Sequence, residues 1–149
     1  MVNNYLGEVM NITEGLKIKE DQFISWSVSF EEFRDICQHN NIDYQLEIGN
    51  ILKKIVLSIE FANLGKVKAS FCFINETIKE VYITKESETE FSIDEFFNIR
   101  NKLILYFGNP KLQNKKKAVW KFNKIQIKHF YIKKDDIVMD YLVLENNYL

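Results

Sequence analysis

Two stretches of the chain repeat hydrophobic residues at helical spacing. The first begins at Ser29, which together with Glu32 matches a capping box, and we expect Asn40 and Asn41 to end it. Its apolar face consists of Phe30, Phe33, Ile36 and Cys37. A helix with one apolar face packs that face on a core and leaves the other face in solvent.

The second helical stretch begins at Ser92, with Glu95 in position to close another capping box. Gly108 offers the left-handed conformation that often ends a helix, and Pro110 prevents its continuation. The stripe predicted to face the core consists of Ile93, Phe96, Phe97, Arg100, Leu103, Ile104 and Phe107. We therefore predict a helix that begins at Ser92 and ends before Gly108.

Alternation of apolar and polar residues predicts strands in most of the remaining chain. Between the two helices, residues 55–61 and 67–73 alternate, and Gly65 supplies the positive φ that the turn between them needs. This turn sets Glu60 opposite Lys68, which is a favourable pair. The two runs therefore predict an antiparallel hairpin with one apolar face.

A third strand is predicted at residues 78–84, but its register is not fixed by the pattern. Ile78 and Tyr82 point to one face, whereas Val81 and Ile83 point to the other. The sequence therefore leaves open which face of this strand lies in the core.

The order of the predicted elements gives the fold class. Three alternating runs follow the second helix, at residues 118–123, 125–132 and 136–145, and residues 15–19 predict an edge strand. Strands joined by short turns are antiparallel, so we predict an α+β fold of order (β)-α-β-β-β-α-β-β-β. Both helices are expected to pack on one face of a curved sheet. With 149 residues, 46% of them hydrophobic, the chain is expected to form one domain, with residues 1–13 flexible or peripheral.

The segment from residue 111 to residue 134 holds nine lysines and no acidic residue. With a two-residue turn at Asn123-Lys124, Trp120 and Phe122 lie on one face of this hairpin and are predicted to enter the core. The lysines on the opposite face are Lys117, Lys121 and Lys128. The basic run is therefore interpreted as the solvated side of a hairpin.

Five apolar side chains share the face of the lysines when the last hairpin turns at residues 133–136. They are Val119, Phe130, Met139, Tyr141 and Val143. Such a group exceeds scattered exposure, so another segment covers it or it forms a contact surface for a protein. A platform for single-stranded nucleic acid on residues 115–134 is a further alternative, but the pI of 6.2 disfavours it.

Acidic residues gather in the first third of the chain. Residues 1–50 hold nine acidic and three basic side chains, a net charge of −6, whereas the remainder carries +5. The acids around the first helix are Glu31, Glu32, Asp35, Asp43 and Glu47. A solvated helix face explains them, and the alternative is an anionic surface for a basic partner.

The residues that could carry chemistry are few. His39 lies at the expected end of the first helix, where it suits the helix dipole. The predicted register of the last hairpin sets His129 opposite Asp140, a pair that could serve as a general base in a small-molecule or enzymatic cup. No spacing ties a nucleophile to this pair, and a structural pair is the simpler interpretation. No metal-ligand motif is present, so we expect no metal and no cofactor.

Features of targeting and redox chemistry point to the cytoplasm. The first residues lack a basic segment followed by an apolar one, and no apolar run approaches the length of a membrane span. Cys37 and Cys72 have no Cys-x-x-Cys neighbour and are expected to be reduced thiols that pack as small apolar groups.

Over residues 92–145 the chain resembles small cytosolic immunity proteins of bacterial toxin–immunity systems, including contact-dependent inhibition. The run FSIDEFFNIRNKLILYFGNP, followed by VWKF and IKHF, carries the resemblance. It implies a single α+β domain that neutralises a toxin domain, such as a nuclease, by occluding it. No functional residue is carried over from it.

These observations favour a non-enzymatic protein-binding domain. The first candidate surface is the acidic one around the first helix, and the second consists of Lys117, Lys121, Lys128, Phe130, Met139 and Tyr141. The two predict opposite responses to salt, because only the acidic surface would bind mainly by charge. A homodimer is left open.

Overall fold

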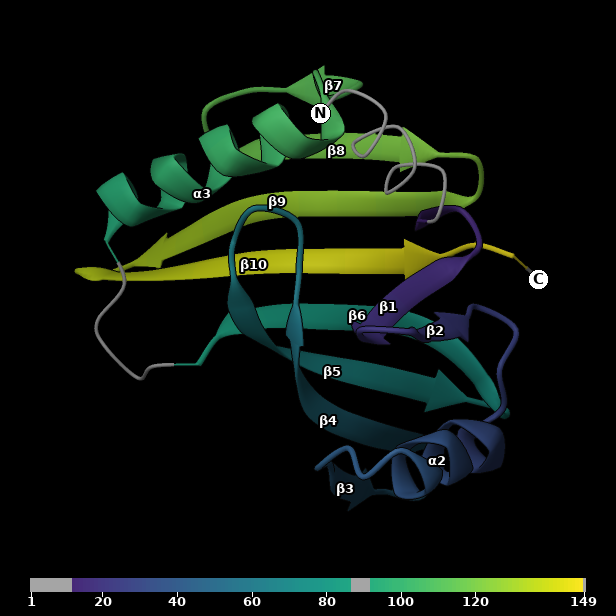
Figure 1. Ribbon diagram of the computed structural model, residues 1–149. Helices are drawn as coiled ribbons and strands as arrows, with labels where there is room; N and C mark the ends of the chain where they lie inside the picture. The colour runs from purple at the N-terminus through teal and green to yellow at the C-terminus, as the bar shows by residue number, and fades with distance from the viewer. Residues whose placement is uncertain (1–11, 87–91, 149) are drawn as a thin grey trace.

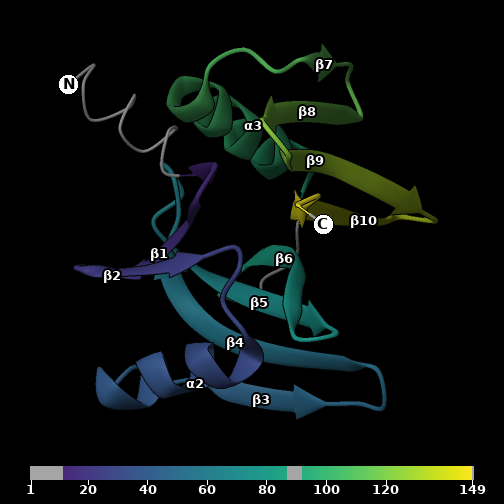
Figure 2. The same cartoon turned by 90° about the vertical axis from the view of Figure 1, so that its right-hand side faces the viewer.

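A curved antiparallel sheet of eight strands dominates the computed structural model, which describes residues 12–86 and 92–148 (Figure 1). The strand order is β3-β4-β5-β6-β10-β9-β8-β7. The strands are β3 (Gln45–Ile48), β4 (Leu52–Glu60), β5 (Lys66–Ile74), β6 (Thr77–Lys85), β7 (Leu112–Gln113), β8 (Lys117–Phe122), β9 (Ile125–Lys134) and β10 (Ile137–Asn146). A separate hairpin of β1 (Gly15–Lys19) and β2 (Gln22–Ser25) lies with helices α2 (Phe30–His39) and α3 (Ile93–Phe107) on one side of the sheet (Figure 2).

The two halves of the sheet have the same layout. Each half is a helix followed by four strands, and the halves meet where β6 pairs antiparallel with β10. The predicted α+β class, with an antiparallel sheet and two helices, is confirmed. The predicted order omits the short strands β2, β3 and β7, and β1 pairs with β2 rather than at an edge of the main sheet. In β3 and β7 every residue is exposed, so no alternation between core and solvent marks them.

Both helices begin and end where the sequence predicts. The Ser29 hydroxyl accepts from the Glu32 amide and the Glu32 carboxylate accepts from the Ser29 amide, so the first capping box is complete. At α3 the Ser92 hydroxyl accepts from the Glu95 amide, but the Glu95 carboxylate binds Lys85 Nζ at 2.9 Å instead. Gly108 ends α3 with φ 87°.

Two of the predicted hairpin registers are wrong by two residues. The turn before β10 has two residues, with Asp135 at φ 57°, so His129 lies opposite Leu142 rather than Asp140. The turn between β4 and β5 is longer than predicted, and Glu60 lies opposite Lys66. A shift by two preserves the face of every side chain, so the predicted faces are correct although the partners are not. The β8–β9 register is as predicted.

A bulge resolves the ambiguous strand β6. Cys72 lies opposite Glu80 and Phe73 opposite Ile78, so Lys79 is an extra residue on β6. Because of this residue, Ile78 and Val81 both face the core and both are buried. A strict alternation with a period of two places Ile78 and Val81 on opposite faces, so the sequence pattern could not predict that both are buried.

One hydrophobic core lies between the sheet and the elements that cover it. Phe33 of α2 contacts Phe71 of β5, with ring centroids 4.7 Å apart, and Phe107 of α3 lies 6.3 Å from Trp120 of β8. Trp120 is 1% exposed and donates from Nε1 to the Gly108 carbonyl, as its predicted place in the core requires. Ile12, near the end of the segment 1–13 that is expected to be flexible or peripheral, is buried in the same core. Residues 1–11 lie outside the described part of the chain.

Replacing Gly15 by alanine is expected to lower the free energy of unfolding by about 2 kcal/mol. A Cβ on Gly15 would lie 1.8 Å from the carbonyl oxygen of Ile24, so the β1–β2 hairpin must separate or shift. Gly49→Ala is the matched control, because its nearest contact is 3.3 Å away. Urea denaturation measures both, and equal midpoints would contradict the close packing of β1 on β2.

Candidate protein-binding surface

The face of the sheet opposite the helices, here called the outer face, carries no other described element (Figure 2). Over the C-terminal half of the sheet and the adjoining strand β6, this face carries an apolar patch. The residues that form this outer patch are Tyr82, Leu112, Val119, Phe130, Ile132, Ile137, Met139, Tyr141 and Val143. Leu112, Ile132, Ile137 and Met139 are exposed large hydrophobic side chains. An apolar group of this size on an open sheet face is typical of an interaction surface.

A stacked aromatic pair lies in the middle of the outer patch. Phe130 and Tyr141 are opposite each other on β9 and β10, with ring centroids 5.0 Å apart and an interplanar angle of 16°. Each ring therefore covers one face of the other. A platform for nucleic acid needs ring faces that are open to bases, so this packing disfavours the stacking alternative.

Lysines border the outer patch. Lys117 lies opposite Phe130, and Lys121 extends the same strand into solvent. Lys128 forms an ion pair with Glu145 at 2.9 Å. Neither Lys117 nor Lys121 forms an ion pair within the described residues, so the border carries positive charge that a partner could neutralise.

All six residues of the second candidate surface lie on the outer face, as the alternation predicts. The sequence reasoning missed Ile132 and Ile137, although both continue the alternation toward the tip of the β9–β10 hairpin. It missed Leu112 because β7 is a strand of two residues with no periodic signal. Tyr82 was missed because the register of β6 was open.

The five acidic residues of the first candidate surface do not form one patch. Glu31 binds Arg34 at 2.5 Å, and Glu32 caps α2. Glu47 lies opposite Lys54 on the outer face, with a distance of 4.0 Å between the charged atoms, whereas α2 packs on the core face. Asp35 on α2 and Asp43 before β3 form no ion pair with the described residues. The acids therefore divide between a helix face and a sheet edge.

The predicted pair of His129 and Asp140 is not formed. His129 is fully buried under α3, its ring stacks on Phe96 at 4.1 Å, and neither ring nitrogen has a hydrogen-bond partner within the described residues. Burial, together with the nearby Arg100, lowers the pKa of His129 to about 3. Asp140 lies opposite Tyr131 instead, and burial raises its pKa. The register error removes the orienting carboxylate that a general-base histidine would need.

The remaining reactive groups are held in structural roles. Cys37 and Cys72 are buried free thiols, and burial raises the pKa of each to about 11, which leaves them protonated and weakly nucleophilic at neutral pH. His39 bonds the Asp35 carbonyl through Nδ1 at 2.8 Å at the end of α2. No group of three His, Cys, Asp or Glu residues in the described ranges could hold a metal ion.

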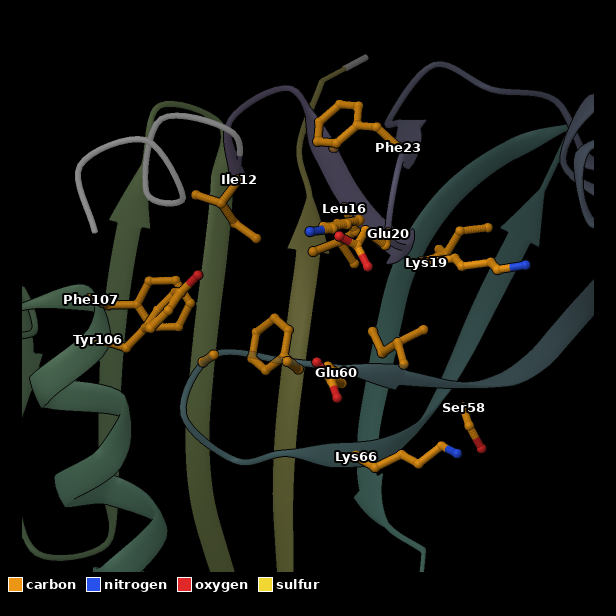
Figure 3. A pocket seen from close by; sticks show the side chains of 16 residues that line it. Ile12, Leu16, Lys19, Glu20, Phe23, Ser58, Glu60, Lys66, Tyr106 and Phe107 are labelled. Atoms are coloured by element: carbon orange, nitrogen blue, oxygen red, sulfur yellow. The ribbon is translucent and has the colours of Figure 1, made fainter. Parts of the chain in front are cut away.

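A cleft of about 690 Å³ opens on the helical side of the sheet, between β1, the end of β4 and the end of α3 (Figure 3). Its apolar lining includes Leu16, Phe61 and Phe107, and its rim carries charges of both signs, such as Glu60 and Lys66. None of its described lining residues is a histidine or cysteine. The mixed rim gives the cleft no strong preference for the charge of a ligand. A second, smaller cavity of about 110 Å³ has Asp140 in its wall, without His129.

Neither described helix has the length and hydropathy to span a membrane. No protein-family model matches the chain, and neither the curated proteins nor the solved structures gave a match.

Proposed function

We propose that the protein is a non-enzymatic protein-binding domain that holds its partner against the outer patch. The observation that carries the proposal is the stacked pair of Phe130 and Tyr141 within an apolar, lysine-bordered sheet face that no described element covers. Rigid aromatic side chains in the centre of an apolar patch are the usual anchors of protein interfaces.

The more specific form of the proposal is an immunity protein that acts in the cytoplasm and neutralises a toxin domain by occluding it. Its basis is the resemblance of residues 92–145 to such proteins, together with the apolar patch on a sheet face that no described element covers. The partner surface is expected to be apolar at its centre and acidic at its border, because Lys117 and Lys121 need opposite charge there.

Met139→Lys is expected to weaken partner binding about thirtyfold or more, equivalent to ~2 kcal/mol, because it places a charge beside the Phe130–Tyr141 pair within the buried contact. The assay pairs the protein with the C-terminal domain of the polypeptide encoded immediately upstream of its gene. Growth rescue on co-expression and the Kd of the purified complex are measured. Leu105→Lys is the matched control, since Leu105 is 74% exposed on α3 and lies outside the patch.

Salt separates the two candidate surfaces in the same assay. Binding through the outer patch is expected to weaken only slightly between 50 and 500 mM salt, because salt screens the border charges of Lys117 and Lys121 but not the apolar centre. Binding through the acids of α2 would weaken strongly. If a Glu31→Lys/Asp35→Lys variant loses partner binding while the Met139→Lys variant binds as the native protein does, the interface lies on α2 and not on the outer patch. A partner domain that is not toxic would overturn the immunity function alone.

A further inference from the structure

The strand β3 is an open edge of the sheet. It pairs with β4 and with no other strand in the described part of the chain, and all four of its residues are exposed. Leu46 is 38% exposed and Ile48 is 64% exposed. Proteins usually protect such edges with charges, proline or very short strands, because an open edge pairs readily with another chain.

The hydrogen-bonding pattern shows which backbone groups are free to pair. The Gly49 amide donates to the Leu52 carbonyl at 2.8 Å, so Gly49 and Leu52 form a hydrogen-bonded pair. Antiparallel pairs alternate, and therefore Glu47 also bonds to β4, opposite Lys54. The amides and carbonyls of Leu46 and Ile48 consequently point away from the sheet. The edge offers two donors and two acceptors in one row.

The opposite edge of the sheet does not have this character. The strand β7 occupies the matching position in the C-terminal half, but it has only two residues. Such a short strand cannot direct the pairing of an added segment. The two halves have the same layout, so the difference between their edges points to a specific use of β3.

The charges around β3 indicate which kind of segment could pair with its open edge. Residues 43–50 include Asp43 and Glu47 and no basic residue. Both acids are exposed, and the ion pair of Glu47 with Lys54 is long, at 4.0 Å. On the other face of the strand, Leu46 and Ile48 present aliphatic surface. A segment that matches this edge has aliphatic side chains on one face and basic side chains on the other.

We propose that β3 pairs with an extended segment of the partner protein in which aliphatic and basic residues alternate, so that the partner adds a ninth strand to the sheet. This inference rests on the proposed protein-binding function and names the chemistry of one part of the partner. The backbone pairing supplies affinity, and Glu47 with Leu46 and Ile48 supplies the selection by charge and shape.

The test uses a capped, fluorescent peptide of seven residues in which lysine and isoleucine alternate. The pairing of β4 with β3 is the guide to this choice, because there Lys54 lies opposite Glu47 and Ile55 opposite Leu46. We expect it to bind the native protein by fluorescence anisotropy. N-methylation of the alternate amides that face β3 is expected to weaken binding at least about tenfold, the loss of one or two hydrogen bonds. N-methylation of the other alternate set leaves the side chains identical and should have little effect.

Amide exchange locates the peptide on the edge. In the free protein, the Leu46 and Ile48 amides are expected to exchange fast and the Glu47 amide slowly, and the peptide should slow the exchange of Leu46 and Ile48. Ile48→Lys is expected to reduce peptide binding about tenfold by charge repulsion and loss of apolar contact. Ile51→Lys is the matched control, because Ile51 is 78% exposed but lies beyond the strand.

Three results would overturn the inference. They are the absence of peptide binding, equal binding of both N-methylated peptides, and a dimer in light scattering that Ile48→Lys dissociates, since the occupant would then be a second copy of the chain. The outcome is independent of the outer patch, because Met139→Lys should leave peptide binding unchanged. If the peptide binds but the domain encoded upstream does not, the proposed partner is rejected, whereas the pairing of β3 with an extended segment stands.

Discussion

Replacement of Arg100 by methionine is expected to lower the free energy of unfolding by about 3 kcal/mol. Arg100 lies on the buried face of α3 and donates from Nη1 to the Asn114 carbonyl at 2.5 Å and from Nη2 to the His129 carbonyl at 3.4 Å. Its guanidinium also lies 5.0 Å from the centre of the Phe96 ring. Methionine fills part of the space but removes the donor to the part-buried Asn114 carbonyl and to the buried His129 carbonyl. A buried acceptor without a donor is destabilising by about 1–3 kcal/mol.

Two opposing effects set this magnitude. Burial lowers the pKa of Arg100, which means that the folded protein holds the cation at a cost in solvation. Removal of the charge recovers that cost and offsets part of the lost hydrogen bonding. The net effect remains destabilising because Arg100 is the contact through which α3 holds the turn before β8 and strand β9 together.

Urea denaturation followed by tryptophan fluorescence measures the effect, since Trp120 lies in the core near the end of α3. Lys102→Met is the matched control, because Lys102 is an exposed cation on the same helix and the same change should stay within about 0.5 kcal/mol of the native protein. An Arg100→Met variant as stable as the control would show that these bonds contribute nothing net.

The sequence predicts the helices well because their limits depend on local chemistry. Ser29 and Ser92 accept from the amides three residues later, and Gly108 takes a positive φ, all within a few residues of chain. Strand faces are equally local, since a period of two places Trp120 in the core whatever the partner strand is. These features need no knowledge of the tertiary fold.

Register and edges could not be predicted in the same way. The pairing of His129 with Leu142 depends on whether the turn at Asp135 has two residues or four, and both lengths suit the sequence. The bulge at Lys79 depends on packing against β5. The strand β3 has no buried face, so only its pairing with β4 reveals it. The predicted pair of His129 and Asp140 is wrong because it depends on the length of this one turn.

For the outer patch, the alternation of residues predicts the face of each side chain but not its partner on the next strand. Phe130 and Tyr141 were assigned to the correct face with the wrong partners, because the error in register was even. Whether another segment covered them could not be decided, since a cover comes from elements far away in sequence. The structure places both helices and the β1–β2 hairpin on the other side, because Phe33 and Phe107 find their apolar partners there.

Acidification from pH 7.5 to pH 4.5 is expected to destabilise the native protein through His129, and a His129→Phe variant should lose most of this sensitivity. The pKa of His129 is about 3 in the folded protein, against 6.5 for an exposed histidine. The unfolded chain therefore binds a proton that the folded protein rejects. The contribution of His129 to stability is complete above pH 6.5 and is lost progressively between pH 6.5 and pH 3.

The size of the effect follows from the shift in pKa. A shift from 6.5 to about 3 corresponds to roughly 5 kcal/mol at its limit, of which about 2–3 kcal/mol should be lost by pH 4.5. Asp140 acts in the opposite direction, because burial raises its pKa and protonation then favours the folded state. The difference between native and variant proteins isolates His129, since Asp140 is present in both.

Urea denaturation at intervals of one pH unit gives the two stability curves. Phenylalanine keeps a ring that can stack on Phe96 and removes two ring nitrogens that have no hydrogen-bond partner in the described part of the chain. The variant is therefore expected to be at least as stable as the native protein at pH 7.5. His39→Gln is the control, because His39 is the second of the two histidines and is exposed at the end of α2. Parallel curves for the native protein and His129→Phe would show that His129 takes up its proton in the folded state, and the environment described for its ring would then be wrong.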